Sequence, residues 1–149
     1  MDYYRNPDFP NSFNEPFIKT SLATEKYNCI AHAVFNDSEW YEPAKPEYLT
    51  FWPNDVPREY TIDAYFQLFE SYGYSKCKNG DIEEGFIKIA FFYSTNKYNN
   101  PDSFHAARQL SDGQWTSKLG ESIDVSHTLN AMSNSNYGEV IQFFKKKQD

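Results

Sequence analysis

The sequence predicts an α+β domain in which N-terminal helices pack on an antiparallel β-sheet. Three patterns point to this class. Apolar residues recur at helical spacing after Thr61, largely apolar runs after Gly85 are typical of strands, and the segment 111–113 (SDG) indicates a tight hairpin. Helices that precede a run of antiparallel strands are the usual order of elements in α+β domains.

Chain length and composition indicate one globular domain, which we expect to occupy residues 1–149. The mean hydropathy is −0.77 although 40% of the residues are hydrophobic, so the core must be built mainly from 13 Phe, 12 Tyr and 3 Trp. So many aromatic residues argue against a disordered chain. No apolar run approaches the roughly 20 residues that a membrane-spanning helix needs, so we expect no membrane partner.

The first third of the chain is expected to contain little regular structure. Residues 1–20 are rich in Asn and Pro and predict an irregular N-terminal arm. Asn28 is a favoured N-cap residue type and predicts a short helix that continues to Phe35. Repeated prolines between Trp40 and Pro57 then predict a long ordered loop.

The clearest elements are predicted after residue 60. A helix begins at Thr61, carries one apolar face and ends at Gly73, a residue type that favours helix C-termini. The predicted strands comprise residues 85–93, 103–110, 114–118 and 139–144, and a short helical segment is predicted over residues 124–132. Together these elements give the helices-then-sheet order of the predicted fold class.

The net negative charge argues against partners that are themselves polyanions. The net charge is −7, and the basic cluster Lys145–Lys147 is expected to be a solvated tail, so we expect no nucleic-acid binding. The first residues show no basic region followed by an apolar stretch, so we expect a cytoplasmic protein. In that reducing compartment Cys29 and Cys77 are expected to be free thiols. The sequence indicates no oligomeric state.

Cys29 is the candidate nucleophile because of its position. It lies in the first turn of the helix predicted at Asn28, where the helix dipole lowers the pKa of a thiol. A nucleophilic cysteine needs an imidazole to take its proton, and His105 begins a predicted strand that could reach this helix. The alternative interpretation is that Cys29 is simply a small buried hydrophobic residue.

The motifs around these two residues resemble two groups of proteins. The segments Tyr27–Ala33 (YNCIAHA), His105–Gln109 (HAARQ) and Trp115–Gly120 (WTSKLG) resemble an uncharacterised bacterial domain family that implies no activity. More loosely, Cys29 and His105 are similar in type and order to the pair in papain-like amidases and peptidases, including NlpC/P60- and CHAP-type hydrolases. This second resemblance implies a papain-like fold with Cys29 opening a central helix and His105 beginning a strand.

The papain-like resemblance also implies a third catalytic residue that orients His105. No residue of this sequence matches that position cleanly. Ser117 is the first polar candidate on the partner strand of the hairpin. The further candidates are Gln114, Asp124 and His127. We therefore take Cys29, His105 and Ser117 as the candidate catalytic residues.

Four further residues are candidates for oxyanion or substrate binding. The Tyr27 hydroxyl and the Asn28 amide lie next to Cys29 in the sequence and could help its backbone amide to stabilise an oxyanion. His32 follows Cys29 by three residues and is either a cleft wall or a core histidine. Trp52 belongs to the aromatic Pro-rich loop, which could line a substrate groove or pack on the core.

We expect no metal and no other cofactor. Cys29, His32, His105 and His127 are residue types that bind zinc, but the sequence lacks paired C-x-x-C and H-x-x-x-H spacings. No phosphate-binding loop motif occurs, so a nucleotide cofactor is not expected either.

The predicted function is a thiol-dependent hydrolase or acyltransferase that acts on an amide bond. The Cys29 thiolate would attack the carbonyl carbon, and His105 would protonate the leaving amine. The alternative is a non-catalytic protein-binding domain on the same fold, for which the acidic composition and the aromatic loop supply a recognition face. In both cases the expected partner is a protein or a peptide.

Overall fold

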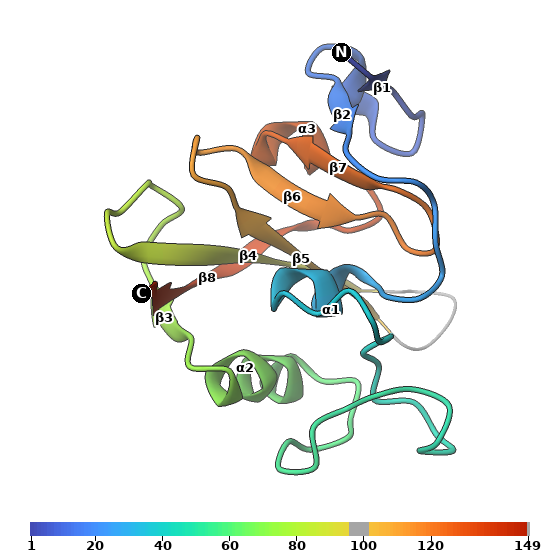
Figure 1. Cartoon of the computed structure of the whole chain (residues 1–149), viewed down its shortest axis with the longest axis vertical. Coiled ribbons are helices and arrows are strands. Elements are labelled where there is room, and N and C mark those ends of the chain that lie inside the picture. Colours follow the sequence, from blue (N-terminus) through green and yellow to red (C-terminus); the bar gives the residue numbers. More distant parts are fainter. Residues whose placement is uncertain (96–101, 149) are drawn as a thin grey trace.

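The fold is dominated by a β-sheet. The computed structural model describes residues 1–95 and 102–148, and within them eight strands form one sheet in the order β1-β2-β7-β6-β5-β4-β8-β3 (Figure 1). Each neighbouring pair of strands is antiparallel. The strands are β1 (Tyr3–Tyr4), β2 (Phe17–Lys19), β3 (Ser75–Cys77), β4 (Phe86–Ser94), β5 (Ser103–Gln109), β6 (Trp115–Lys118), β7 (Asp124–His127) and β8 (Glu139–Lys147).

The helices are few and short, and this corrects the predicted papain-like α+β fold with N-terminal helices packed on a sheet. The helical elements of the described residues are η1, a 3-10 helix (Pro10–Phe13), and the α-helices α1 (Cys29–Ala33), α2 (Ile62–Ser71) and α3 (Leu129–Met132). The fold is therefore β-rich. No helix in the described part of the chain is long and apolar enough to cross a membrane.

The prediction failed where strands form only by long-range pairing. The expected irregular arm, residues 1–20, contributes β1 and β2, and β2 pairs Ile18 with Ser126 of β7. Residues 124–127 of the expected helical segment are that strand, and only Leu129–Met132 is helical. Short strands have weak local preferences, because most of their stability comes from neighbours that the local pattern does not reveal.

The C-terminal prediction also needs correction. Lys145–Lys147, expected as a solvated tail, continues β8 and pairs with β4 on one side, while Lys145 also pairs with Ser75 of β3 on the other. The β3 strand itself carried no signal in the sequence. Lys146 and Lys147 lie beyond the last residue that β3 pairs with, and charged residues are typical of such exposed strand edges, so three lysines in a row do not exclude a strand.

Several local predictions are confirmed by the caps and turns. The Asn28 side chain accepts a hydrogen bond from the backbone N–H of Ala31, which caps α1, and Thr61 caps α2 in the same way. Gly73 follows α2 with a φ of +91°, a left-handed conformation that favours glycine. The turn at residues 111–113 joins β5 to β6 as a hairpin.

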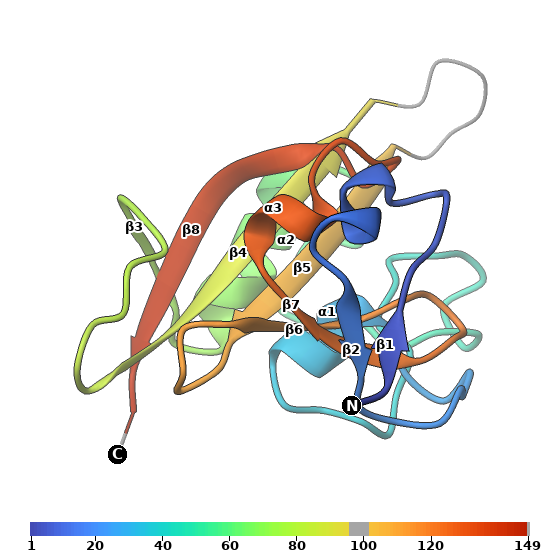
Figure 2. The ribbon, with the colours of Figure 1, turned by 90° about the horizontal axis from the view of Figure 1, so that it is seen from above.

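The sheet carries an aromatic core on each of its two faces. One core lies under α1 and α2 and includes Phe69, Phe91 and Phe144. The other lies under η1 and α3 and includes Phe17 and Phe92. Figure 2 shows α2 behind the strands and α3 in front of them. Neighbouring residues of a strand, such as Phe91 and Phe92, therefore serve different cores.

Replacing Phe69 by Ala tests the first core. The Phe69 ring is fully buried and packs against Phe91 and Phe144, with ring centroids 5.7 and 5.2 Å away. We expect Phe69→Ala to lower the free energy of unfolding by about 3–5 kcal/mol, the usual cost of deleting a buried ring. Phe13→Ala is the control, because Phe13 is 53% exposed and should change stability by less than about 1 kcal/mol. Equal losses in urea unfolding would contradict the core assignment.

Candidate functional site

Cys29 is the first residue of α1 and lies against β5. Its sulfur is 3.9 Å from the carbonyl oxygen of Phe104. A hydrogen bond with the backbone of Ala106 lowers the pKa of the thiol. The thiol is buried, and this burial raises its pKa to about 11 although the backbone hydrogen bonds oppose the shift. The expected lowering by the helix dipole does not prevail. The thiol is therefore protonated at neutral pH.

His105 faces the other core of the molecule. Cys29, Phe91 and Ala106 belong to the core under α1 and α2, whereas His105 packs on Phe92, with ring centroids 5.5 Å apart, in the core under α3. Residues 104, 105 and 106 are consecutive in β5, so the His105 side chain leaves the strand on the side opposite to its neighbours. Cys29 contacts the face that Phe104 and Ala106 share.

The hydrogen bonding of His105 does not involve Cys29 either. Its Nε2 lies 3.1 Å from the Ser117 hydroxyl oxygen, and its buried Nδ1 has no hydrogen-bond partner among the described residues. Neither imidazole nitrogen is therefore bonded to the Cys29 sulfur. The predicted Cys29–His105 dyad is not assembled in this structure, because the period-two alternation of β5 directs the imidazole to the wrong face. The interpretation of Cys29 as a nucleophile stays a prediction.

Ser117 and His105 do come together, but as part of a buried network with His127. The Ser117 hydroxyl lies 2.7 Å from Nε2 of His127, whose Nδ1 donates to the backbone carbonyl of Thr128 at 2.8 Å. Nε2 of His127 must then accept the Ser117 proton, and Ser117 in turn accepts from Nε2 of His105. This proton order is consistent with two neutral imidazoles. Burial lowers the pKa of His127 to about 4 and holds that of His105 well below its ordinary value.

Three of the candidate oxyanion and substrate residues use their polar groups in hydrogen bonds that hold the fold together. The Asn28 amide donates to the carbonyl of Tyr41 at 2.7 Å, and its oxygen accepts from the N–H groups of Ala31 and Tyr41. The Trp52 indole is 4% exposed and donates to the carbonyl of Pro57 at 2.9 Å, so Trp52 belongs to the core. The Tyr27 hydroxyl donates to Oδ2 of Asp124 at 2.7 Å.

A groove of about 250 Å³ opens beside Cys29. We refer to it as the Cys29 groove, and the residues that give it its character are Cys29, Glu42, Tyr60, Tyr65, Phe104 and Tyr137. The Glu42 carboxylate accepts hydrogen bonds from the Tyr60 hydroxyl and from the indole N–H of Trp40. The Tyr65 ring stacks on Phe104 with centroids 4.3 Å apart. The groove therefore combines a fixed carboxylate with aromatic walls.

A second polar cluster lies on the α1 side of the sheet and involves His32. Its Nδ1 is 2.9 Å from Oδ1 of Asp37 and 3.9 Å from Oδ2 of Asp124, while its Nε2 is 3.0 Å from the Thr116 hydroxyl. His105 and His127 lie on the other face, so the four zinc-ligand types considered from the sequence are not gathered. His32, Asp37 and Asp124 instead offer one donor atom each within 4.8 Å of one another.

This His32 cluster was not predicted from the sequence. Asp124 was a candidate only for orienting His105, yet it lies on the opposite face and contacts Tyr27 and His32. Asp37 follows α1 by four residues and looks like a surface residue. The pairing that places Asp124 beside His32 is the β6–β7 register, in which Lys118 faces Asp124 and Thr116 faces Ser126 on the same side of the sheet, and residues 124–127 carried no strand signal.

Comparison with known proteins gives a family but no activity. A family model described as a domain of unknown function, DUF7689, matches residues 18–145. No curated protein and no solved structure matches the chain. The resemblance to an uncharacterised domain family is thus confirmed, whereas the resemblance to papain-like amidases and peptidases is not.

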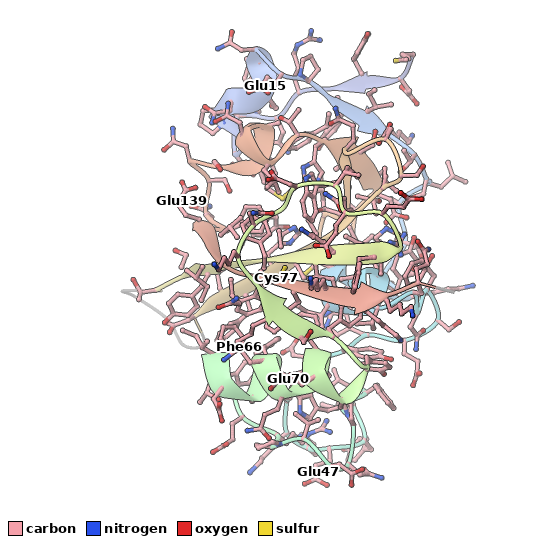
Figure 3. All side chains as sticks on the ribbon, turned by 90° about the vertical axis from the view of Figure 1, so that its left-hand side faces the viewer. Glu15, Glu47, Phe66, Glu70, Cys77 and Glu139 are labelled. Atoms are coloured by element: carbon pink, nitrogen blue, oxygen red, sulfur yellow. The ribbon has the colours of Figure 1, made fainter. Side chains whose placement is uncertain are left out.

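Thiol alkylation tests the state of Cys29. At pH 7.5 we expect iodoacetamide to modify Cys77 at least ten times faster than Cys29, because Cys29 is buried with a raised pKa. Cys77 is the internal control, since it is half-buried on the edge strand β3, on the side shown in Figure 3. Mass spectrometry of the two peptides gives both rates. Faster modification of Cys29 below pH 8.5 would indicate an activated thiol.

The buried histidines predict a loss of stability in mild acid. Their pKa is lower in the folded chain than in the unfolded chain, so the unfolded state binds more protons below about pH 6.5. Folding is therefore most favourable above that pH. As the pH falls from 6.5 towards 4, each histidine removes up to about 1.4 kcal/mol per pH unit.

Urea unfolding at pH 7.5, 6.0 and 5.0 measures this effect above the range in which most carboxylates titrate. In His127→Gln we expect a flatter pH dependence, because one of the two titrating groups is gone. A wild-type stability that stays constant from pH 7.5 to 5.0 would show that these imidazoles are not held neutral.

Proposed function

Because the chain belongs to the DUF7689 family, a domain of unknown function, its role has to be argued from its own residues, and we propose that it is a protein-binding domain. The Cys29 groove is the proposed recognition site, and its occupant is a Lys or Arg side chain from an extended segment of the partner. The observation that carries this proposal is the Glu42 carboxylate, fixed by Trp40 and Tyr60 inside an aromatic groove.

The chemistry of the groove suits a long cationic side chain. A carboxylate offers charge-assisted hydrogen bonds to ammonium or guanidinium groups. The ring of Tyr60, which is half-buried, also lines the groove and attracts a cation over its face. Glu42 is half-buried, so part of its charge is shielded from water and acts more strongly than a surface carboxylate.

Size and overall charge agree with this occupant. The groove volume of about 250 Å³ lies below the roughly 300–1,000 Å³ of most sites for whole small-molecule ligands, so it suits one side chain better. The net charge of −7 favours basic partners, because complementary charge raises the rate of encounter.

A thiol-dependent amide hydrolase or acyltransferase is the second candidate. The observation that favours it is that Cys29, the first residue of α1, lines the same groove. Acyl transfer also needs a base that ionises the thiol. The raised pKa of Cys29 and the bonding of His105 to Ser117 both favour binding over catalysis.

Binding measurements with short peptides test the proposal. We expect peptides with a central Lys or Arg to bind more tightly than otherwise identical peptides with a central Gln or Leu. Glu42→Gln should weaken the Lys and Arg peptides at least tenfold, because it removes the charge from the groove. The control is Glu47→Gln, which removes the same charge from an exposed position outside the groove and should leave affinity unchanged (Figure 3).

The same peptides separate the two candidate functions. Peptide binding that persists in Cys29→Ala, without any cleavage by the wild type, is the outcome expected of a binding domain. Cleavage or acyl transfer that disappears in Cys29→Ala would overturn the proposal in favour of the thiol enzyme. Equal affinity for all four peptides would overturn the cationic occupant.

A further inference from the structure

The His32 cluster contains a buried carboxylate that the fold leaves only partly paired. Oδ2 of Asp124 accepts from the Tyr27 hydroxyl, but Oδ1 is buried and has no hydrogen-bond partner among the described residues. The Asp124 side chain is 9% exposed. A buried carboxylate with one unpartnered oxygen costs free energy, so the Asp124 side chain as a whole favours a cationic partner.

The nearby basic side chains do not pair with this carboxylate. The Arg108 guanidinium donates to the backbone carbonyl of His32 at 3.0 Å, and the Lys118 ammonium donates to two backbone carbonyls. In residues 1–95 and 102–148, the group within ion-pair distance of both Asp37 and Asp124 is His32 itself. Both carboxylates thus converge on one imidazole nitrogen.

We infer that His32, Asp37 and Asp124 form a binding site for a divalent transition-metal ion. Ligand atoms at about 2.1 Å from a common ion lie about 3.0–3.4 Å apart, as tetrahedral or octahedral geometry requires. Nδ1 of His32 is 2.9 Å from Oδ1 of Asp37 and 3.9 Å from Oδ2 of Asp124. The three atoms lie within 4.8 Å, so a shift of about 1 Å suffices to close the site.

The donor set indicates which ions fit. One imidazole nitrogen and two carboxylate oxygens suit Zn²⁺, Mn²⁺ or Co²⁺, whereas Ca²⁺ and Mg²⁺ prefer oxygen ligands alone. The side chain of Asp37 is 55% exposed, so an ion can enter from solvent on that side. Three protein ligands leave at least one coordination position for water or for a further ligand.

The groups behind the ligands are those that support metal sites. Nδ1 of His32 carries a proton when it donates to Asp37, and an ion would replace that proton. The proton can move to Nε2, which would then donate to the Thr116 hydroxyl at 3.0 Å. The Tyr27 hydroxyl holds Oδ2 of Asp124 and fixes the direction of the carboxylate. No large rearrangement is needed in either case.

Metal titration of the purified full chain tests this inference, which does not depend on the proposed function. We expect Zn²⁺ to bind with a 1:1 ratio in calorimetry and Ca²⁺ to show no saturable binding. Asp124→Asn should weaken Zn²⁺ binding at least tenfold while keeping the shape of the side chain. Asp37→Asn should do the same and is safe for folding, since Asp37 is exposed. Asp55→Asn, at an exposed position outside the cluster, is the control for lost charge.

A cobalt spectrum distinguishes this site from the thiols. Co²⁺ bound by His32, Asp37 and Asp124 should show no sulfur-to-metal charge-transfer band, and its visible bands should be lost in Asp124→Asn. A sulfur band that disappears in Cys29→Ser or Cys77→Ser would overturn the inference, as would equal Zn²⁺ affinity in the wild type and both aspartate variants. None of these readouts involves Glu42 or peptide binding, so the two proposals fail separately.

Discussion

The alternation of side chains along β5 and β6 is the constraint on which the chemistry of this chain depends. Thr116 and Lys118 face α1, while Ser117 between them faces the core under α3 and joins His105. A slip of one residue in this hairpin would move every one of these groups to the other face. The turn around Gly113, with a φ of +90°, and the pairing of Arg108 with Thr116 fix the register. Two polar networks that lie close in the sequence are thereby kept on opposite faces of one sheet.

Lys118 shows how the same constraint ties the chain together. Its side chain is fully buried, which is rare for lysine, and burial lowers its pKa. The ammonium group compensates by donating to the carbonyls of Thr24 and Gly120, and it lies 5.0 Å from the centroid of the Tyr27 ring. These contacts fasten the segment before α1 to the β6–β7 turn. They therefore place Tyr27, and through it Asp124, relative to the sheet.

Local chemistry made part of this arrangement predictable. The Asn28 and Thr61 caps, Gly73 and the β5–β6 hairpin follow from rules that act within a few residues, and all were predicted. The alternation of side chains along a strand is also a local rule, and it places Arg108 and His105 on opposite faces of β5, where Arg108 contacts the α1 side through the carbonyl of His32. The same alternation decides whether His105 points toward Cys29. Using it requires knowing which face of the sheet α1 packs on. That face, the pairing of β2 with β7 and the approach of Asp37 to Asp124 are long-range facts that no local pattern encodes.

Helix α1 is where the two candidate sites meet, and its length explains why they are coupled to the fold. Five residues are far fewer than the roughly 12–15 that an isolated helix needs for stability in water. The helix persists because Asn28 caps it and because Ala31 and Ala33 bring it close to β5 and β6. Cys29 at its beginning lines the groove, and His32 near its end faces Asp124, so a bound peptide and a bound ion would act on the same short element.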